Sequence, residues 1–544
     1  MKKIYFLIII ICAIQVLSAR SQNRIITSSD LINSDFNINE GILINRVGQH
    51  FNLDLLDTGK NPTEIHNRDS IFYDVYGDLL DDDKEYNPKY SLLIPSLEII
   101  LENALLNRID VYVLNLDFAK VSTTSWNRNL NAGFPWGDGW WWDRDRFGNN
   151  FMSHPATGSL YFNSVRSSGY SFWTAYPFTL AGAYMWKIFG ENGKPEREDI
   201  PNTTFDGVFL GEVLYRLSSN VLDDRTSGSE RFGREFLAFL LDPIRGINRL
   251  LQGKTGRTTP REVYQKEPLT VGLSAGMRKA NEGVSFWTGK TNEIINVQLD
   301  YGDPFEDKSR KAFDVFKFRG EFNFGAGRKI VDNLIGYGLL TGKTVQNGDL
   351  DILYGIFQNY DYWDNTTFEY GSAGFTGGIM TKYNLSKNSN LYTKLHIGYI
   401  PLAGASKWFG PSDTIQSRDY DYGTGMQAQF ETNLNLGRVL SITLRDYNYW
   451  VHTFNGPDNL YYASEGIYVN TSGNTFINII KPQLTLTIAG NLRIGFEQLI
   501  YYSDMYSISH SVVHRNQTEQ KIFLTYNIED FHHGNKPDNK EKNE

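Results

Sequence analysis

The sequence predicts an α+β protein in which an N-terminal helical domain precedes an antiparallel transmembrane β-barrel of about 12 strands. Three observations predict this fold class. Residues 147–218 form an apolar, aromatic and small-residue-rich stretch with helical spacing. From about residue 265 onward, apolar residues alternate with polar ones, as in strands with two different faces. The 544-residue chain contains 34 Phe, 32 Tyr and 49 Gly, yet its mean hydropathy is −0.39, which suits strands that expose alternate side chains to lipid.

The first 21 residues are predicted to be a secretory signal peptide. Lys2 and Lys3 give a positive end, residues 4–17 form an apolar run, and residues 19–21 provide a small–x–small cleavage site. A membrane anchor is the alternative interpretation, but this run is short for a transmembrane helix. Cys12, the one cysteine of the sequence, lies inside the run, so we expect a mature protein without disulfides or thiol chemistry.

A polar segment is expected at residues 22–87. Its acidic cluster at 78–85 lacks the alternating oxygen ligands and the turn glycine of a calcium loop, so a solvated acidic turn is the favoured interpretation. The formal net charge of the chain is −9 and its charges are interspersed, which does not indicate a nucleic-acid partner.

Residues 88–255 are predicted to form the helical domain. Apolar residues recur at helical spacing in the first part of this range, at 88–118. A second helix is expected to be capped by Ser153 and to end near Ser168. A third, at 170–189, is almost free of charge.

The next helix is expected to begin at Asp199 or Asn202. It carries Gly207 and Gly211 four residues apart, so both lie on one face and allow another helix to approach closely. The last helix, at 229–251, is amphipathic and is interrupted by a proline at position 243.

The predicted loop at 119–153 is rich in tryptophan, with five at positions 126, 136, 140, 141 and 142. Tryptophan gathers at lipid–water interfaces, where its ring is half wetted. A packed aromatic loop that covers the helices explains the same residues equally well, so both interpretations stay open.

Residues 265–531 are predicted to form the barrel. In the stretch 315–325, four phenylalanines alternate with lysine, arginine, glutamate and asparagine, which places lipid on one side and a wet lumen on the other. A soluble β-sandwich is the alternative, and the predicted signal peptide and the aromatic content favour the barrel. Phe531 ends the last apolar run, and a polar tail at 532–544 departs from the terminal aromatic residue that is common in outer-membrane barrels.

His154 is the first candidate for chemistry, because it stands near Asp143 and Asp145 in the sequence. A histidine beside carboxylates can be a general base or a metal ligand, and a helix-capping histidine is the structural alternative. Glu212 and Arg216 are four residues apart and can pair on one helical face. With Arg166 and His154 they can form one buried polar network, and a lipid-headgroup or substrate site is the alternative. The sequence shows no zinc spacing, phosphate-binding loop or nucleophile elbow, so we expect no metal and no cofactor.

Three stretches carry a family resemblance: HPATGSLYFNSVRSSGYSFW at 154–173, GVFLGEVLYRLS at 207–218 and DPIRGINRLLQGK at 242–254. They resemble the uncharacterised-domain family DUF3943 of bacterial outer-membrane proteins over about residues 88–255. The resemblance implies a Gram-negative outer-membrane setting with a barrel behind the domain, and it brings no catalytic residues. Members place a glutamate where this chain has Lys187, which argues against an essential carboxylate there. The matching residues are His154, Gly158, Tyr161, Arg166, Gly169, Tyr170, Gly211, Glu212 and Arg216.

Together these observations predict an exported outer-membrane protein with a non-enzymatic envelope role in binding, transport or structural support. Its helical domain is expected at the periplasmic end or in the mouth of the barrel. The alternative is an envelope- or lipid-directed enzyme that uses His154, Asp143, Asp145, Glu212 and Arg216. An enzyme requires these side chains to converge on an open cleft, whereas a structural role requires them to be paired and closed off. The expected partners are outer-membrane lipid and other envelope proteins.

Overall fold

The structure is a computed structural model that describes most of the chain from residue 91 to residue 528. The residues between these limits that it does not describe are 136, 138, 143–146, 260–261, 283–284, 326–329, 366–367, 407–419, 455–459, 463–467, 471–472 and 508–511. The predicted signal peptide, the polar segment at 22–87, Phe531 and the tail at 532–544 lie outside the described residues.

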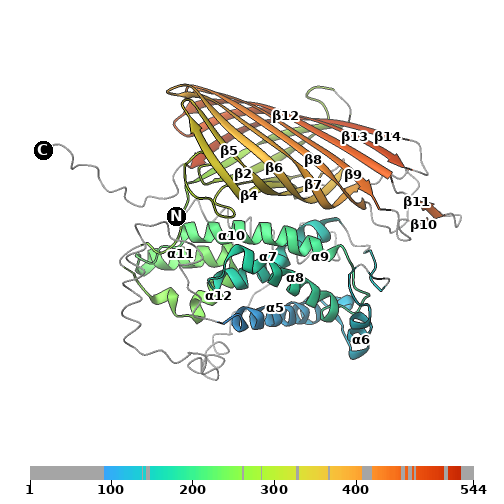
Figure 1. Cartoon of the computed structure of the whole chain (residues 1–544). Helices are drawn as coiled ribbons and strands as arrows, with labels where there is room; N and C mark the ends of the chain where they lie inside the picture. Colours follow the sequence, from blue (N-terminus) through green and yellow to red (C-terminus); the bar gives the residue numbers. More distant parts are fainter. Residues whose placement is uncertain are drawn as a thin grey trace.

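Helices occupy the N-terminal part of the described chain (Figure 1). They are α5 (Leu93–Tyr112), η2 (Asp117–Ala119), α6 (Thr123–Asn131), η3 (Asn149–Ser153), α7 (His154–Ser167), α8 (Phe172–Phe189), α9 (Asp199–Pro201), η4 (Asn202–Asp206), α10 (Gly207–Val221), α11 (Gly228–Leu241), α12 (Pro243–Leu251) and η5 (Lys254–Gly256).

The helix boundaries follow local signals in most places. Asp242 caps α12 by accepting a hydrogen bond from the backbone of Arg245, and the proline that follows it ends α11, as predicted. The prediction that Ser153 caps α7 is wrong. Ser153 has helical backbone angles and makes no side-chain cap, because the π-helical turn η3 already leads into α7.

Within the described residues, twelve strands close into one antiparallel barrel, which confirms the predicted fold class and strand number. Closure comes from the pairing of the first strand with the last, in which Val271 lies opposite Ile528. A separate hairpin, β10–β11, lies outside the barrel sheet. The strands are β1 (Leu269–Glu282), β2 (Lys290–Tyr301), β3 (Phe316–Phe324), β4 (Val331–Asn347), β5 (Leu350–Asp364), β6 (Glu369–Ser386), β7 (Ser389–Ser406), β8 (Tyr420–Leu436), β9 (Leu440–Thr453), β10 (Leu460–Tyr462), β11 (Tyr468–Asn470), β12 (Gly473–Ala489), β13 (Leu492–Ser507) and β14 (Val513–Ile528).

The two ends of the barrel differ. One end carries tight turns, at 348–349, 387–388, 437–439 and 490–491, and we call it the short-turn end. The other end carries the connections at 407–419 and 454–472, and we call it the long-loop end.

The alternation predicted for the strands is present in the barrel wall. Arg319 of β3 points into the lumen and donates a 2.9 Å hydrogen bond to Glu431 of β8, whereas its neighbour Phe318 points outward. Large apolar side chains on the outside are half exposed, such as Ile397 at 51%. A closed cylinder with a polar lumen and an apolar exterior is the pattern of a lipid-facing barrel and not of a β-sandwich.

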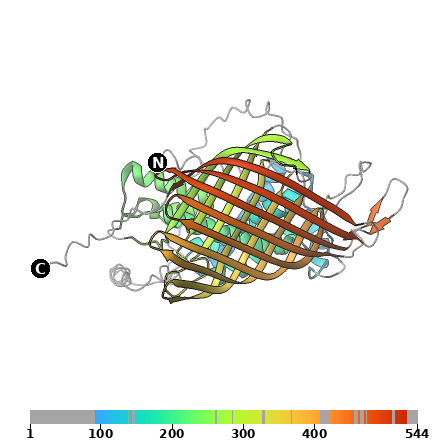
Figure 2. The same cartoon turned by 90° about the horizontal axis from the view of Figure 1, so that it is seen from above.

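The helical domain lies against the outside of the barrel wall, with α10 next to the strands (Figure 1). Viewed from above, the barrel covers the helices (Figure 2). The side chains of strand β5 show that the helices contact the outer side of the wall and not the lumen. Phe357 stacks on His396 inside the lumen, with ring centroids 4.1 Å apart. The next outward residues reach the helices instead: Gln358 donates to the Phe205 carbonyl at 2.6 Å, and Tyr360 stacks on Phe209.

The expected place of the helical domain, at the periplasmic end or in the mouth of the barrel, is therefore wrong. The reason lies in the outward side of the strands, where aromatic rings and glycines provide a surface for helices. Phe205 packs edge-on against Phe375, and Phe151 packs against Tyr420 and fits over Gly371.

Candidate functional site

The histidine singled out by the sequence belongs to a buried polar cluster that we call the His154 cluster: His154, Lys187, Glu191, Glu196 and Asp199. His154 begins α7, Lys187 lies in the last turn of α8, and Asp199 begins α9. His154 Nε2 lies 3.2 Å from the Asp199 carboxylate. Close packing of α7 and α8 brings together groups that are far apart in the sequence.

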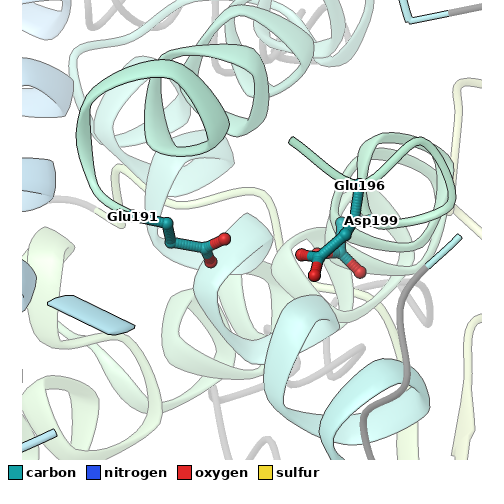
Figure 3. Close-up of side chains that lie close together, drawn as sticks. All are labelled: Glu191, Glu196 and Asp199. Atoms are coloured by element: carbon teal, nitrogen blue, oxygen red, sulfur yellow. The ribbon is translucent and has the colours of Figure 1, made fainter. Parts of the chain in front are cut away.

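Lys187 is the hub of the His154 cluster. Its Nζ lies 2.7 Å from Glu191 and 2.8 Å from Glu196, and it also pairs with Asp199. The Lys187 side chain is 2% exposed, and a buried ammonium requires such partners. The three carboxylates, which Figure 3 shows, therefore share a cation that the chain itself supplies, the Lys187 ammonium.

The charges of this hub follow from its geometry. Burial alone would lower the pKa of the Lys187 ammonium, but Asp199, Glu191 and Glu196 outweigh burial and raise the pKa well above its ordinary value. Burial alone would raise the pKa of the Asp199 carboxyl, whereas His154 and Lys187 hold it below its ordinary value. Lys187 and Asp199 are therefore both charged at neutral pH.

The carboxylates of this cluster also have the spacing of a metal site. Glu191, Glu196 and Asp199 place ligand oxygens within 4.8 Å of one another (Figure 3). Carboxylate oxygens suit hard cations, but the Lys187 ammonium already lies among all three groups. The arrangement is therefore an ion-pair cluster centred on lysine.

His154 is partly accessible, with 16% of its side chain exposed, and Glu191 and Glu196 are partly accessible as well. The predicted partners Asp143 and Asp145 lie outside the described residues. Sequence reasoning missed that Asp199 is the partner of His154 and that Lys187 links three acids. A signal was present, because Lys187 is the one charge in the predicted helix at 170–189, and a charge in an apolar helix calls for buried partners.

Glu212 and Arg216 belong to a second, separate network. Glu212 accepts bonds of 2.8 and 3.1 Å from Arg166 and of 2.8 Å from Arg216. Arg216 continues to the Ala312 carbonyl at 2.8 Å and to Asp314 at 3.3 Å, in the β2–β3 connection of the barrel. The predicted i,i+4 pair is present, and Arg166 joins it.

The Glu212 network is closed off. Glu212, Arg166 and Arg216 have side chains that are at most 2% exposed, and His154 pairs with Asp199 instead of joining them. This is the arrangement that a structural role requires, since the network fixes α7 and α10 to each other and to the barrel.

The lumen holds a third polar group of residues. Glu431 attracts Arg319 at 2.9 Å, Lys317 at 3.5 Å and Arg445 at 3.6 Å. A second set joins Lys521 to Glu321 at 2.8 Å. These charges come from strands on different sides of the barrel, so they bridge the lumen.

Aromatic residues fill the lumen toward the long-loop end. Phe368 stacks on Tyr501 with ring centroids 3.8 Å apart, and Tyr370 packs on Tyr449 at 4.3 Å. Trp363 is fully buried beside them. The described residues therefore close the lumen at this level.

A cavity of about 430 Å³ remains at the short-turn end of the lumen. Its charged lining consists of five cations and two acids, and we call it the mouth cavity. The charged residues that line it are Asp300, Lys317, Arg319, Lys382, Glu431, Arg445 and Arg493.

Comparison with known proteins gives one family. The model of a family described as "Domain of unknown function (DUF3943)" matches residues 139–244, which confirms the predicted resemblance for this segment. No curated protein sequence matches the chain.

Solved structures with similarity to the barrel are outer-membrane proteins. The NanC porin is 7% identical over 47% of this chain and 98% of its own, with a TM-score of 0.24. The channel DcaP of Acinetobacter baumannii is 6% identical over 48% and 96%, with a TM-score of 0.22. OmpT of Vibrio cholerae is 9% identical over 48% and 98%, with a TM-score of 0.22.

Proposed function

We propose that the protein is a non-enzymatic outer-membrane β-barrel that binds a small anionic solute in the mouth cavity of its lumen. The observation that carries this proposal is the excess of cations around the mouth cavity, with five lysines and arginines against two acids. The cavity volume of about 430 Å³ falls within the roughly 300–1,000 Å³ that is usual for small-molecule sites.

Two of the cations are available to a ligand. Lys317, Arg319 and Arg445 are engaged with acids of the lumen. Among the described residues, Arg493 and Lys382 form no ion pair with an acid; the Nε of Arg493 has no hydrogen-bond partner, and Lys382 lies over the ring of Phe305. Guanidinium and ammonium groups in a sheltered site form strong charge-assisted hydrogen bonds with carboxylates and phosphates, so these two side chains are suited to an anion.

The closed lumen favours binding over free conduction. The ion pair of Lys521 with Glu321 and the aromatic layer around Tyr501 stand between the mouth cavity and the long-loop end. The apolar exterior, with side chains such as Ile397 half exposed, supports placement of the barrel in an outer membrane.

Titration calorimetry on the full chain in detergent tests this function, with glucuronate, inorganic phosphate and glucose as probes. We expect at least one of the two anions to bind more tightly than the neutral sugar. The Arg493→Gln change should weaken that binding about tenfold, because it removes one charge-assisted contact. Added salt should weaken it further.

The matched control is Lys387→Gln, in an exposed tight turn outside the mouth cavity, which should leave the binding unchanged. If neither anion binds better than glucose, or if Arg493→Gln and Lys387→Gln behave alike, the proposed anion site is wrong.

A lipid-directed enzyme is the second candidate, and the His154–Asp199 pair favours it. A partly accessible imidazole held 3.2 Å from a charged carboxylate is a possible general base. The test is mass spectrometry of phospholipid vesicles incubated with the full chain. Lipid cleavage that is lost in folded His154→Gln would establish the enzyme and displace the binding role. Lipid cleavage at the same background level with both proteins would exclude the enzymatic role.

A further inference from the structure

Helix α5 has its polar residues inside and its apolar residues outside. Its buried side carries Glu102, Asn103 and Asn107. Each has a partner within the domain: Ser164 donates to Glu102 at 2.5 Å, Tyr161 donates to Asn103 at 3.1 Å, and Asn107 donates to two backbone carbonyls. A surface helix of a water-soluble domain has the opposite arrangement.

The outward side of α5 is correspondingly apolar. Leu101 is 66% exposed, and Leu97, Ile100 and Leu105 are also exposed on the same side. The charged residue among the outward positions of this helix is Arg108, one turn from its end.

Helix α12 has the same reversed arrangement, with polar residues inside and apolar residues outside. Arg245, Asn248 and Arg249 are buried, whereas Leu250 and Leu251 are exposed at 60% and 64%. Arg245 donates to the Ser218 and Ser219 hydroxyls, and Arg249 pairs with Glu235 and Asp224.

The exposed apolar side chains of the two helices make up what we call the outer apolar face: Leu97, Ile100, Leu101, Leu105, Leu250 and Leu251. Asn248 of α12 donates to Glu98 of α5 at 3.1 Å, which places the helices side by side. Both lie on the side of the helical domain that is turned away from the barrel (Figure 1).

The lipid-facing exterior of the barrel continues up to the docked domain. On β5, Ile356 is 50% exposed on the outside. The next outward residue, Gln358, already donates to the Phe205 carbonyl of the helical domain. The domain therefore takes the place of lipid on this part of the wall and stands at the level of the apolar exterior.

We infer that the outer apolar face contacts the acyl chains of the bilayer, so that the helical domain lies in the membrane beside the barrel. In the part of the chain that the structure describes, no helix has both the length and the apolar content to cross a bilayer unaided. The inference rests on the inverted helices and on their continuity with the barrel exterior. It is independent of the anion site and shares with the proposed function only the membrane placement of the barrel.

Spin labels on single cysteines test this inference in the full chain. The sequence has one cysteine, at position 12, and a Cys12→Ser background makes each added site unique. We would label Leu101→Cys and Leu250→Cys, with Ile397→Cys on the barrel exterior as the lipid reference and Lys387→Cys in an exposed turn as the water reference. The protein is reconstituted into vesicles of phosphatidylcholine and phosphatidylglycerol, and collisions with oxygen and with a water-soluble nickel chelate are measured.

We expect labels at 101 and 250 to behave like the label at 397, with frequent oxygen collisions and a loss of nickel collisions relative to 387. Nickel collisions at 101 and 250 equal to those at 387, with 397 still in lipid, would overturn the inference alone. If 397 also contacts water, the membrane placement of the barrel fails instead. Spectral broadening that disappears on dilution with unlabelled protein would assign the face to a second copy of the chain and overturn the lipid contact.

Discussion

Glu102 lies on the inner side of α5, and the residue is 9% exposed. Burial raises the pKa of Glu102 to about 8, although the hydrogen bond from Ser164 works in the opposite direction. Glu98, on the same helix, has its pKa raised to about 7 by burial. Both carboxyl groups can therefore hold protons close to neutral pH.

The pKa of Glu102 predicts a stability that depends on pH. Between its ordinary pKa of 4.5 and its folded pKa of about 8, the folded chain holds a proton that the unfolded chain has released. The free energy of unfolding therefore falls as the pH rises through this window, by up to about 1.4 kcal/mol per pH unit from this group. Glu102→Gln should remove that share of the slope and should be the more stable protein at pH 8.

Denaturant unfolding in detergent, followed by circular dichroism across the pH window, measures the slope. The matched control is Glu230→Gln on α11, where the carboxyl group is exposed, and its slope should equal that of the unchanged protein. A Glu102→Gln protein that keeps the full slope would contradict the buried, protonated carboxyl group.

At the scale of elements, three glycines set the distance between helices. A Cβ on Gly158 of α7 would meet the Thr203 carbonyl oxygen at 1.8 Å, and a Cβ on Gly207 would meet the backbone of Gly158. Gly211 faces Phe162 in the same way. The prediction that Gly207 and Gly211 admit another helix is therefore confirmed, and that helix is α7.

The close approach of α7 and α10 predicts that one added methyl group at Gly158 lowers the stability of the protein. Gly158→Ala should lower the free energy of unfolding by about 1–3 kcal/mol, because the new Cβ meets backbone that must shift. Gly193→Ala is the control, since a Cβ there would meet nothing within 4 Å. Denaturant midpoints of the two variants make the comparison, and equal midpoints would show that the helices do not approach as closely as described.

At the scale of the whole molecule, the two sides of the barrel wall have different surroundings. Its inner side is filled by the charges around Glu431 and by the aromatic layer around Phe368 and Tyr501. Its outer side is apolar over part of the circumference and is covered by the helical domain over the rest. The Glu212 network fixes this docking through Arg216 and Asp314.

The filled lumen predicts the electrical behaviour of the protein. In planar bilayers the full chain should show no steady open-channel current, because packed aromatic side chains fill the lumen toward the long-loop end. Phe368→Ala, which removes the ring stacked on Tyr501, should produce brief openings. Faster gel migration of the unheated protein than of the boiled protein confirms that a folded barrel was inserted. Stable current steps from the unchanged protein would contradict the closed lumen.

The chemistry of the helical domain could be foreseen only in part. Glu212 and Arg216 share a face by helical spacing, so their pairing was predictable. The His154 partner was not, because Asp199 lies 45 residues later in the sequence and meets it only through the packing of α7 with α8 and the loop that follows.

The sequence by itself determined most of the helices, the alternating strands and the closure into about twelve of them, because local periodicity and turn residues act over a few residues. It missed α6, which lies in the predicted loop at 119–153. Only the tertiary structure decided where the helical domain sits, which acids surround Lys187 and how the lumen is closed. The physical reason is that a period shows which side chains share a face of an element. It does not show whether that face meets water, lipid or another part of the chain, and on α5 and α12 the faces are the reverse of those in a water-soluble domain.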